Sequence, residues 1–181
     1  MYAYAGVIIV IILVVVLLSR KKVLVKSNVD GLYYSVLDEQ RNQDVADALA
    51  EINKRVGLLA EAIQDPIVKQ ALKSKYSYKI ISEAVRAEGM TSYTINKKNI
   101  HVCVRSPKDL EKVYDINTLM YVVIHELAHL IAKGIGHEDE FRSLFRHLLK
   151  EAVVSGVYTV QDYSATPVEY CGMTLASNIL L

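Results

Sequence analysis

Residues 119–132 read LMYVVIHELAHLIA, and this stretch decides how the middle of the chain must fold. Glu126 is its only carboxylate, and it contains no lysine or arginine. A helix with one side in solvent carries charged residues along that side. We therefore expect a helix that is buried on nearly all sides, capped by Asp115 and running to Lys133.

The same stretch contains two histidines four positions apart, His125 and His129. This spacing places both imidazoles on one face of a helix, where they can bind one metal ion. Glu126 lies beside them and is positioned to take a proton from a metal-bound water. This arrangement predicts a zinc site with two ligands and a general base. The alternative is a chance HExxH whose histidines are only hydrogen-bonded, but an unpaired glutamate would then be costly to bury.

A catalytic zinc ion usually has three protein ligands and one open position. Gly134 is expected to end the helix in the left-handed conformation, and Gly136 gives the chain a second flexible point. The chain can then turn back and present His137, which we take as the third ligand. Glu138 and Glu140 are the alternatives, because His-His-Glu sites are also known.

The remaining two histidines are expected to lie outside the metal site. His101 falls in residues 100–105, which alternate like a strand, and it is read as a residue of the polar face. His147 falls on the next helix, expected from Glu138 to about Val154, and is read as an ordinary, partly exposed histidine.

The motif resembles that of the WLM and SprT-like metallopeptidases, which combine HExxH, a short glycine-containing loop, and a histidine followed by an aromatic residue. Here these parts are residues 125–129, Gly136-His137 and Phe141. Residues 167–173 resemble a segment of small WLM-like proteins of large DNA viruses. The resemblance covers about residues 76–175. The gap of seven residues between His129 and His137 is longer than expected for this family, which leaves the third ligand open.

The resemblance implies an α+β fold: a small zincin-like domain of minimal gluzincin type, with the HExxH helix and a small antiparallel sheet. It also implies one Zn²⁺ per chain and a protein or peptide substrate. Some family members cleave proteins crosslinked to DNA. Three of the 21 basic residues and none of the 20 acidic ones lie in residues 1–22, so the remainder is slightly acidic. A domain that binds DNA without sequence preference should be strongly basic, so no nucleic acid partner is expected.

The first 18 residues contain no charged side chain, and Arg20, Lys21 and Lys22 follow them. We expect residues 1–19 to form one N-terminal transmembrane helix. A secretory signal peptide has its positive charges before the apolar run, not after it. The positive cluster predicts an outside N-terminus and a cytosolic domain. The alternative for residues 1–18 is a buried core helix.

In the cytosol, Cys103 and Cys171 are expected to be reduced.

The rest of the chain divides into four expected segments. Residues 20–40 are a juxtamembrane linker with strand character around residues 32–37, residues 41–75 are helical, residues 76–175 form the metallopeptidase domain, and residues 176–181 are a tail. An apolar stripe runs along the helical segment: Val45, Leu49, Ile52, Val56, Leu59 and Ile63. We expect it to pack on the chain's own domain, the alternative being a short coiled coil that forms a weak homo-oligomer.

Further elements are expected around the site. Asp65 and Pro66 should begin a new helix, and another should span residues 77–88. Residues 92–105 read as a hairpin, interrupted at Lys97-Lys98. The strand at residues 99–105 is our candidate for an edge that binds extended peptide.

These features together predict a membrane-anchored zinc metallopeptidase. Its metal ligands are His125, His129 and His137, and Glu126 is the general base. Tyr170 and Arg105 are candidates to stabilise the oxyanion, but each is better explained as a structural residue, and neither is assigned. The alternative is a structural membrane protein whose domain tethers a membrane to a protein layer, such as a virion membrane to its capsid. A membrane-bound metal-binding regulator is a third reading.

Overall fold

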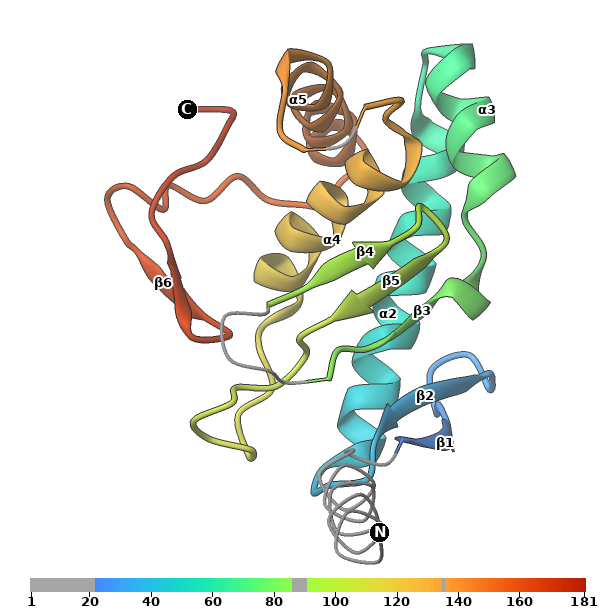
Figure 1. The fold of residues 1–181 in the computed structure, drawn as a ribbon, viewed down its shortest axis with the longest axis vertical. Coiled ribbons are helices and arrows are strands. Elements are labelled where there is room, and N and C mark those ends of the chain that lie inside the picture. Colours follow the sequence, from blue (N-terminus) through green and yellow to red (C-terminus); the bar gives the residue numbers. More distant parts are fainter. Residues whose placement is uncertain (1–21, 86–90, 135) are drawn as a thin grey trace, which may run out of the picture.

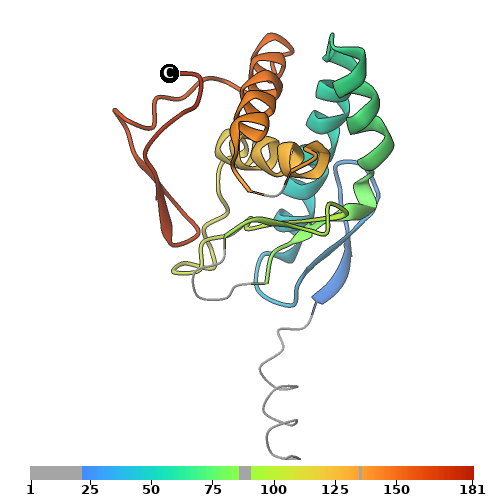
Figure 2. The ribbon, with the colours of Figure 1, turned by 45° about the horizontal axis from the view of Figure 1, so that its top comes forward.

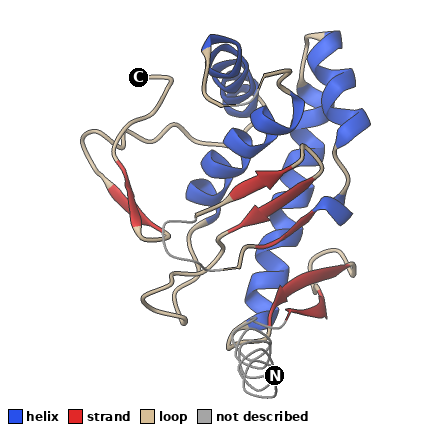
Figure 3. Cartoon of the chain, viewed as in Figure 1, coloured by secondary structure: helices blue, strands red, loops and turns tan. Residues whose placement is uncertain are grey.

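A computed structural model of the chain describes residues 22–85, 91–134 and 136–181. The fold is a mixed α+β domain in which the helices lie on one side of a small central sheet (Figure 1). Figure 3 separates these helices from the strands by colour. The elements, in chain order, are β1 (Lys22–Lys26), β2 (Tyr33–Leu37), α2 (Asn42–Ala62), α3 (Pro66–Lys75), a 3₁₀ turn (Tyr78–Ile80), β3 (Ile81–Glu83), β4 (Tyr93–Ile95), β5 (Asn99–Val102), α4 (Ile116–Ile131), α5 (Asp139–Val154), β6 (Val168–Tyr170) and β7 (Met173–Leu175).

Helix α2 is the long support of the domain. Its apolar stripe is buried along its whole length, and α2 packs against α4, α5 and the β1–β2 hairpin. The stripe therefore serves the chain's own core and is not available for a coiled coil.

In the segment expected to be a linker, residues 22–37 form an antiparallel hairpin whose Tyr34, Val36 and Leu37 are buried. Strand character at residues 32–37 is thus confirmed.

Helix α3 begins as its sequence predicts. The Asp65 carboxylate accepts hydrogen bonds from the backbone N–H groups of Ile67 and Val68, at 2.8 and 3.2 Å. Pro66 occupies the first turn, where its missing N–H costs nothing. Between the end of α2 and this cap the chain changes direction, so that α3 lies against α2 and α4 (Figure 2).

The central sheet has the strand order β3-β5-β4. β4 pairs with β5 in antiparallel fashion, which confirms the expected hairpin, whereas β3 runs parallel to β5. The sheet is therefore mixed and not antiparallel as expected. The helix expected over residues 77–88 was wrong, because residues 81–83 form a strand. The candidate peptide-binding strand was also misplaced, because β5 is the central strand and β3 and β4 are the two outer ones.

A buried ion pair fastens this sheet to α2. Arg105 is 1% exposed, and its Nε and Nη2 donate to the two Glu83 carboxylate oxygens at 2.7 and 3.0 Å. The guanidinium also donates to the Gln40 carbonyl and to Asn42 Oδ1. Glu83 in turn accepts from the Leu37 backbone N–H at 2.6 Å. Arg105 thus joins β2, β3 and the start of α2, and it has a structural role.

The two cysteines are joined in a disulfide, so the expectation that both are reduced was wrong. Cys103 follows β5, and Cys171 lies in the turn between β6 and β7, with their Cα atoms 6.3 Å apart. The residues are 68 positions apart in the sequence, and only the fold brings them together. The Cys171 backbone N–H also donates to the Tyr114 hydroxyl at 2.7 Å. The disulfide anchors the β6–β7 hairpin to the end of the central strand.

The expected membrane anchor, residues 1–19, lies outside the described residues. Among residues 22–85, 91–134 and 136–181, no helix combines the length and the apolar character needed to cross a bilayer.

Candidate metal centre

Helix α4 positions the site, and its sequence explains where it begins. The Asp115 carboxylate accepts from the backbone N–H and the hydroxyl of Thr118, at 2.9 and 2.5 Å, which caps the helix. The helix ends at Ile131, slightly before the expected Lys133. Gly136, rather than Gly134, adopts the left-handed conformation, with φ 102°. The turn that returns the chain to the site is therefore two residues later than expected.

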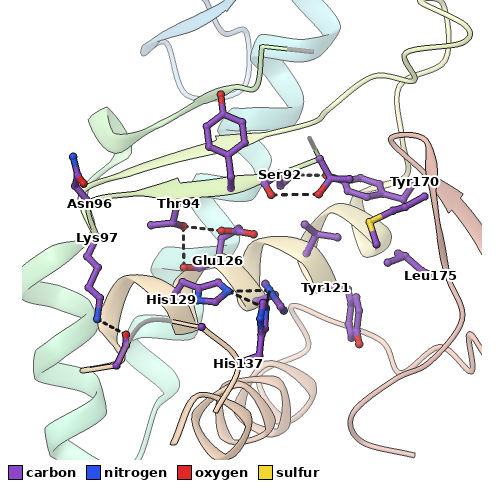
Figure 4. Close-up of a pocket in the computed structure, with 17 residues that line it drawn as sticks. Ser92, Thr94, Asn96, Lys97, Tyr121, Glu126, His129, His137, Tyr170 and Leu175 are labelled. Carbon is purple, nitrogen blue, oxygen red and sulfur yellow. Dashed lines mark hydrogen bonds between the residues drawn. The ribbon is translucent and has the colours of Figure 1, made fainter. Parts of the chain in front are cut away.

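The structure brings together the three histidines that were predicted as ligands. The Nε2 atoms of His125 and His129 are 3.1 Å apart, those of His129 and His137 are 3.2 Å apart, and those of His137 and His125 are 3.0 Å apart (Figure 4). A tetrahedral zinc ion with Zn–N bonds of about 2.0–2.1 Å would separate its ligand nitrogens by about 3.3 Å. Three imidazoles that turn the same nitrogen toward one point cannot satisfy one another by hydrogen bonds alone. The donor set fits a metal ion.

Helix α5 supplies the apolar floor of this cluster. The Phe141 ring stacks on His129 with centroids 4.2 Å apart, and it meets His125 and His137 edge-on at 4.9 and 4.8 Å. Phe145 adds an edge contact to His125 at 5.1 Å. These contacts restrict the rotation of all three imidazoles. They also give Phe141 a physical role in the motif, which is to pack against the ligand rings.

Burial keeps the helix histidines neutral. Desolvation, and then the neighbouring histidines, lower the pKa of His125 to about 3. Desolvation, followed by the charges of His137 and Lys97, lowers the pKa of His129 to about 4. A neutral imidazole is the form that binds a metal. Protons therefore compete with a metal for these two nitrogens only in strongly acidic solution.

For the metal-free chain we expect the melting temperature to fall as the pH drops from 6.5 toward 4. Unfolded histidines take up protons near their ordinary pKa of 6.5, whereas folded His125 and His129 resist until about 3 and 4. Glu126 has the opposite effect on stability between pH 4.5 and pH 7, because its pKa is raised in the fold. Calorimetry in the Glu126→Gln background should show a decrease on the order of 5 °C. Adding His125→Asn and His129→Asn should remove most of this decrease in melting temperature. A melting temperature that does not change with pH while both histidines are present would contradict the lowered pKa values.

Glu126 is buried beside the cluster, with 4% of its surface exposed. Desolvation raises its pKa to about 7, and a hydrogen bond from Thr94 opposes part of that rise. The Thr94 hydroxyl donates to Glu126 Oε2 at 2.7 Å, and Figure 4 shows it reaching across from β4. Sequence reasoning missed Thr94. Ser92, Thr94 and Asn96, polar residues at every second position, line the cavity together with Tyr93, and their spacing was the available signal.

Lys97 was also missed, although it holds the loop that leads to His137. Its ammonium donates to the carbonyls of Ala132, Lys133 and Gly134, the last two at 2.8 and 2.7 Å. A cation at the carboxyl end of a helix is also favoured by the helix dipole. Asn96 and Lys97 both have positive φ, 51° and 52°, which is the geometry of a tight hairpin turn. This turn aims Lys97 at the end of α4.

A cavity of about 880 Å³ opens beside the histidines. It lies between β4, α4 and the β6–β7 hairpin, and its lining includes Tyr121, Val122, Tyr170, Met173 and Leu175. The Tyr170 side chain is buried, and its hydroxyl is 2.6 Å from Ser92 Oγ. Tyr170 therefore reaches the cavity wall, but its hydroxyl is occupied by Ser92.

The other histidines and acidic candidates lie apart from the cluster. His101 is half-buried on β5, where its Nδ1 is 2.8 Å from Ser82 Oγ. His147 lies on α5, with its Nε2 4.0 Å from the Glu151 carboxylate. Glu140 accepts weak hydrogen bonds from the backbone N–H groups of Lys133 and Gly134, both at 3.4 Å. Neither Glu138 nor Glu140 joins the three histidines, which leaves His137 as the third candidate ligand.

Together, the fold and the histidine cluster define a small α+β domain with a candidate metal centre. The chain belongs to the family of the uncharacterized protein R325 of Acanthamoeba polyphaga mimivirus, with 30% identity over 165 residues, 86% of this chain and 83% of that protein. Uncharacterized protein 042R of invertebrate iridescent virus 3 is 48% identical over 71 residues, 39% of this chain and 44% of that protein. Uncharacterized protein 136R of invertebrate iridescent virus 6 is 39% identical over 80 residues, 44% of this chain and 45% of that protein.

Among solved structures, the chain is similar to the crystal structure of Wss1 from Saccharomyces cerevisiae. The TM-score is 0.52 at 18% sequence identity, and the match covers 66% of this chain and 85% of that chain. At this identity the likeness shows a shared fold. No family model matches the chain.

Proposed function

We propose that the protein is a zinc-dependent metallopeptidase. The observation that carries this proposal is the convergence of three imidazole Nε2 atoms within 3.2 Å of one another, with the buried carboxylate of Glu126 in the same cavity. The resemblance of the motif to the WLM and SprT-like metallopeptidases supports it. The fold that the chain shares with Wss1 is consistent with it.

The chain would hold one zinc ion through His125, His129 and His137. When bound there, zinc would lower the pKa of a water molecule and polarise a substrate carbonyl. Glu126 would accept a proton from the attacking water and donate it to the amide nitrogen as the C–N bond breaks. Desolvation raises the pKa of this carboxylate to about 7 in the metal-free chain. Thr94 would keep Oε2 of Glu126 oriented.

Strand β4 is the proposed binding edge for an extended peptide. Among the described residues it pairs with β5 alone, and its residues line the cavity beside the histidines. A peptide in extended conformation can add to such an edge through main-chain hydrogen bonds. Its scissile carbonyl would then lie near the three imidazoles.

Metal content gives a direct test of the site. The purified chain should contain about one zinc per molecule, and His129→Ala should lose it because the two remaining imidazoles bind the ion far more weakly. His147→Ala is the matched control, since His147 lies on α5 outside the cluster, and it should keep its zinc. Elemental analysis together with circular dichroism makes the measurement. A folded wild-type chain that contains no zinc and takes up none would end the metallopeptidase proposal.

We also propose that residues 1–19 anchor the chain in a membrane as a single span, with the domain on the cytosolic side. Support comes from the uncharged run and the basic cluster after it. Carbonate extraction should leave the chain in the membrane pellet and release a variant that carries Ile11→Lys and Val15→Lys. Release of the unaltered chain would contradict the anchor. The disulfide is typical of oxidising compartments. Protection of the domain from protease added on the cytosolic side would show that the domain lies on the other side of the membrane.

A further inference from the structure

A second, smaller cavity adjoins the histidine cluster on the side of α5. Its volume is about 400 Å³, and it lies between α4, α5 and residues 177–179. Tyr121, His125 and His137 line both cavities, so two of the three candidate metal ligands lie where the cavities meet. A substrate that reaches the histidines would therefore present one part of itself to each cavity.

Two arginines one helical turn apart line this second cavity. Arg142 and Arg146 are both exposed on α5. The Nε of Arg142 donates to the His137 carbonyl at 3.1 Å, and the Nε of Arg146 donates to the Ile179 carbonyl at 3.3 Å. These bonds fix the base of each guanidinium beside the cavity. Within the part of the chain that the structure describes, no carboxylate lies within ion-pair distance of either.

Two acidic residues near this pair in sequence, Glu138 and Glu140, are directed elsewhere. Glu140 turns back to the N–H groups of Lys133 and Gly134. The Glu138 carboxylate also lies beside Gly134, with Oε2 3.5 Å from the place that a Cβ on that glycine would occupy. The second cavity therefore has a local positive charge. Such a charge attracts anionic groups and disfavours cationic ones.

One wall of the larger cavity is apolar instead of charged. Between α4 and the β6–β7 hairpin its wall is formed by Tyr121, Val122, Met173 and Leu175. The disulfide and the Tyr170–Ser92 hydrogen bond hold this wall in place. A large apolar side chain would bury its surface there, whereas a charged one would lose hydration without finding a partner.

We propose that the site acts on polypeptides in which an acidic residue and a large apolar residue flank the cleaved bond. The carboxylate is bound by Arg142 and Arg146, and the apolar side chain enters the cavity against the β6–β7 hairpin. This inference rests on the proposed peptidase function and names the substrate class of that same site.

The test uses the full chain loaded with zinc and quenched fluorescent peptides that differ at two central positions. One peptide carries Asp-Leu, a second Leu-Asp, and matched peptides replace Asp by Asn or Lys, or Leu by Ala. In one of the two orders, the Asp peptide should be cleaved with a kcat/KM about tenfold above its Asn counterpart. The Lys peptide should be the poorest substrate, and Ala should reduce cleavage as well. Raising the salt concentration should shrink the Asp-to-Asn ratio.

Charge variants then assign the effect to the arginines. The Arg142→Gln, Arg146→Gln double variant should bring the Asp-to-Asn ratio close to one, and the corresponding double Lys variant should restore most of it. The ratio is the readout because any loss of zinc affects both peptides equally. Lys150→Gln is the matched control: Lys150 is an exposed cation one turn further along α5, outside both cavities, and its loss should leave the ratio unchanged.

A binding arm separates this inference from the proposed function. Fluorescence anisotropy with zinc-loaded Glu126→Gln measures affinity for the same peptides without cleavage. Tighter binding of the Asp peptide, lost in the arginine double variant, supports the inference even if no peptide is cleaved. Cleavage or binding without preference for Asp overturns the inference and leaves the peptidase function standing. Binding of inorganic phosphate at the arginines with no preference among the peptides would also overturn it. No binding of any peptide overturns it as well.

Discussion

Replacing Glu126 with glutamine is expected to abolish peptide cleavage while leaving the zinc content unchanged. Glutamine has nearly the same shape and can still accept the hydrogen bond from Thr94, but it cannot take a proton from water. Loss of a general base typically costs about 10²–10⁴ in rate. The measurement is kcat/KM for a cleaved peptide beside elemental analysis of the same preparation.

Glu140→Gln is the matched control for that experiment. Glu140 lies in the first turn of α5, where its carboxylate accepts from the backbone of the loop before His137, so it should not be needed as a base. Its variant should keep most of the activity. Undiminished cleavage by Glu126→Gln, with zinc present, would exclude the proposed role of Glu126.

The second large effect is expected at the buried ion pair. Glu83→Gln should lower the free energy of unfolding by about 3–5 kcal/mol, because it leaves the Arg105 charge buried without its partner. Urea unfolding followed by circular dichroism measures this change. Combining Glu83→Gln with Arg105→Met should recover part of the loss, since the unpaired charge is then removed.

Glu61→Gln gives the comparison at the surface. Glu61 pairs with Lys73 at 2.7 Å, but both side chains are well exposed, and such pairs contribute little. Its removal should leave the unfolding midpoint unchanged within error. A Glu83 variant that behaves like the Glu61 variant would show that the Arg105 cluster does not hold the sheet to α2.

Several parts of this fold could be predicted because single residues carry clear local signals. The absence of charge between Leu119 and Ala132, apart from Glu126, indicated a buried helix, and Asp115 marked where it begins. Asp65 and Pro66 did the same for α3. Residues four positions apart share one face of any helix, so the proximity of His125 and His129 can be predicted without knowledge of the tertiary structure.

The features that were missed or misjudged depend on contacts between distant segments. Strand β3 has only three residues, and it is defined by its pairing with β5 and by the contact of Glu83 with Arg105 in the core. Periodicity cannot reveal a strand so short, and the surrounding residues were read as a helix. The roles of Thr94 and Lys97 depend on how the β4–β5 hairpin lies across α4. The Cys103–Cys171 pair depends on the return of the chain after α5.

The disulfide has a practical consequence for anyone who produces this protein. It connects the end of β5 to the turn beside Tyr170, and Tyr170, Met173 and Leu175 form part of the cavity wall. Expression in a reducing cytoplasm, or storage with a thiol reagent, would leave that wall held by hydrogen bonds and packing alone. Two laboratories that use different buffers could then study two different binding surfaces. Peptide screens and inhibitor searches should therefore record the oxidation state of Cys103 and Cys171 for every preparation.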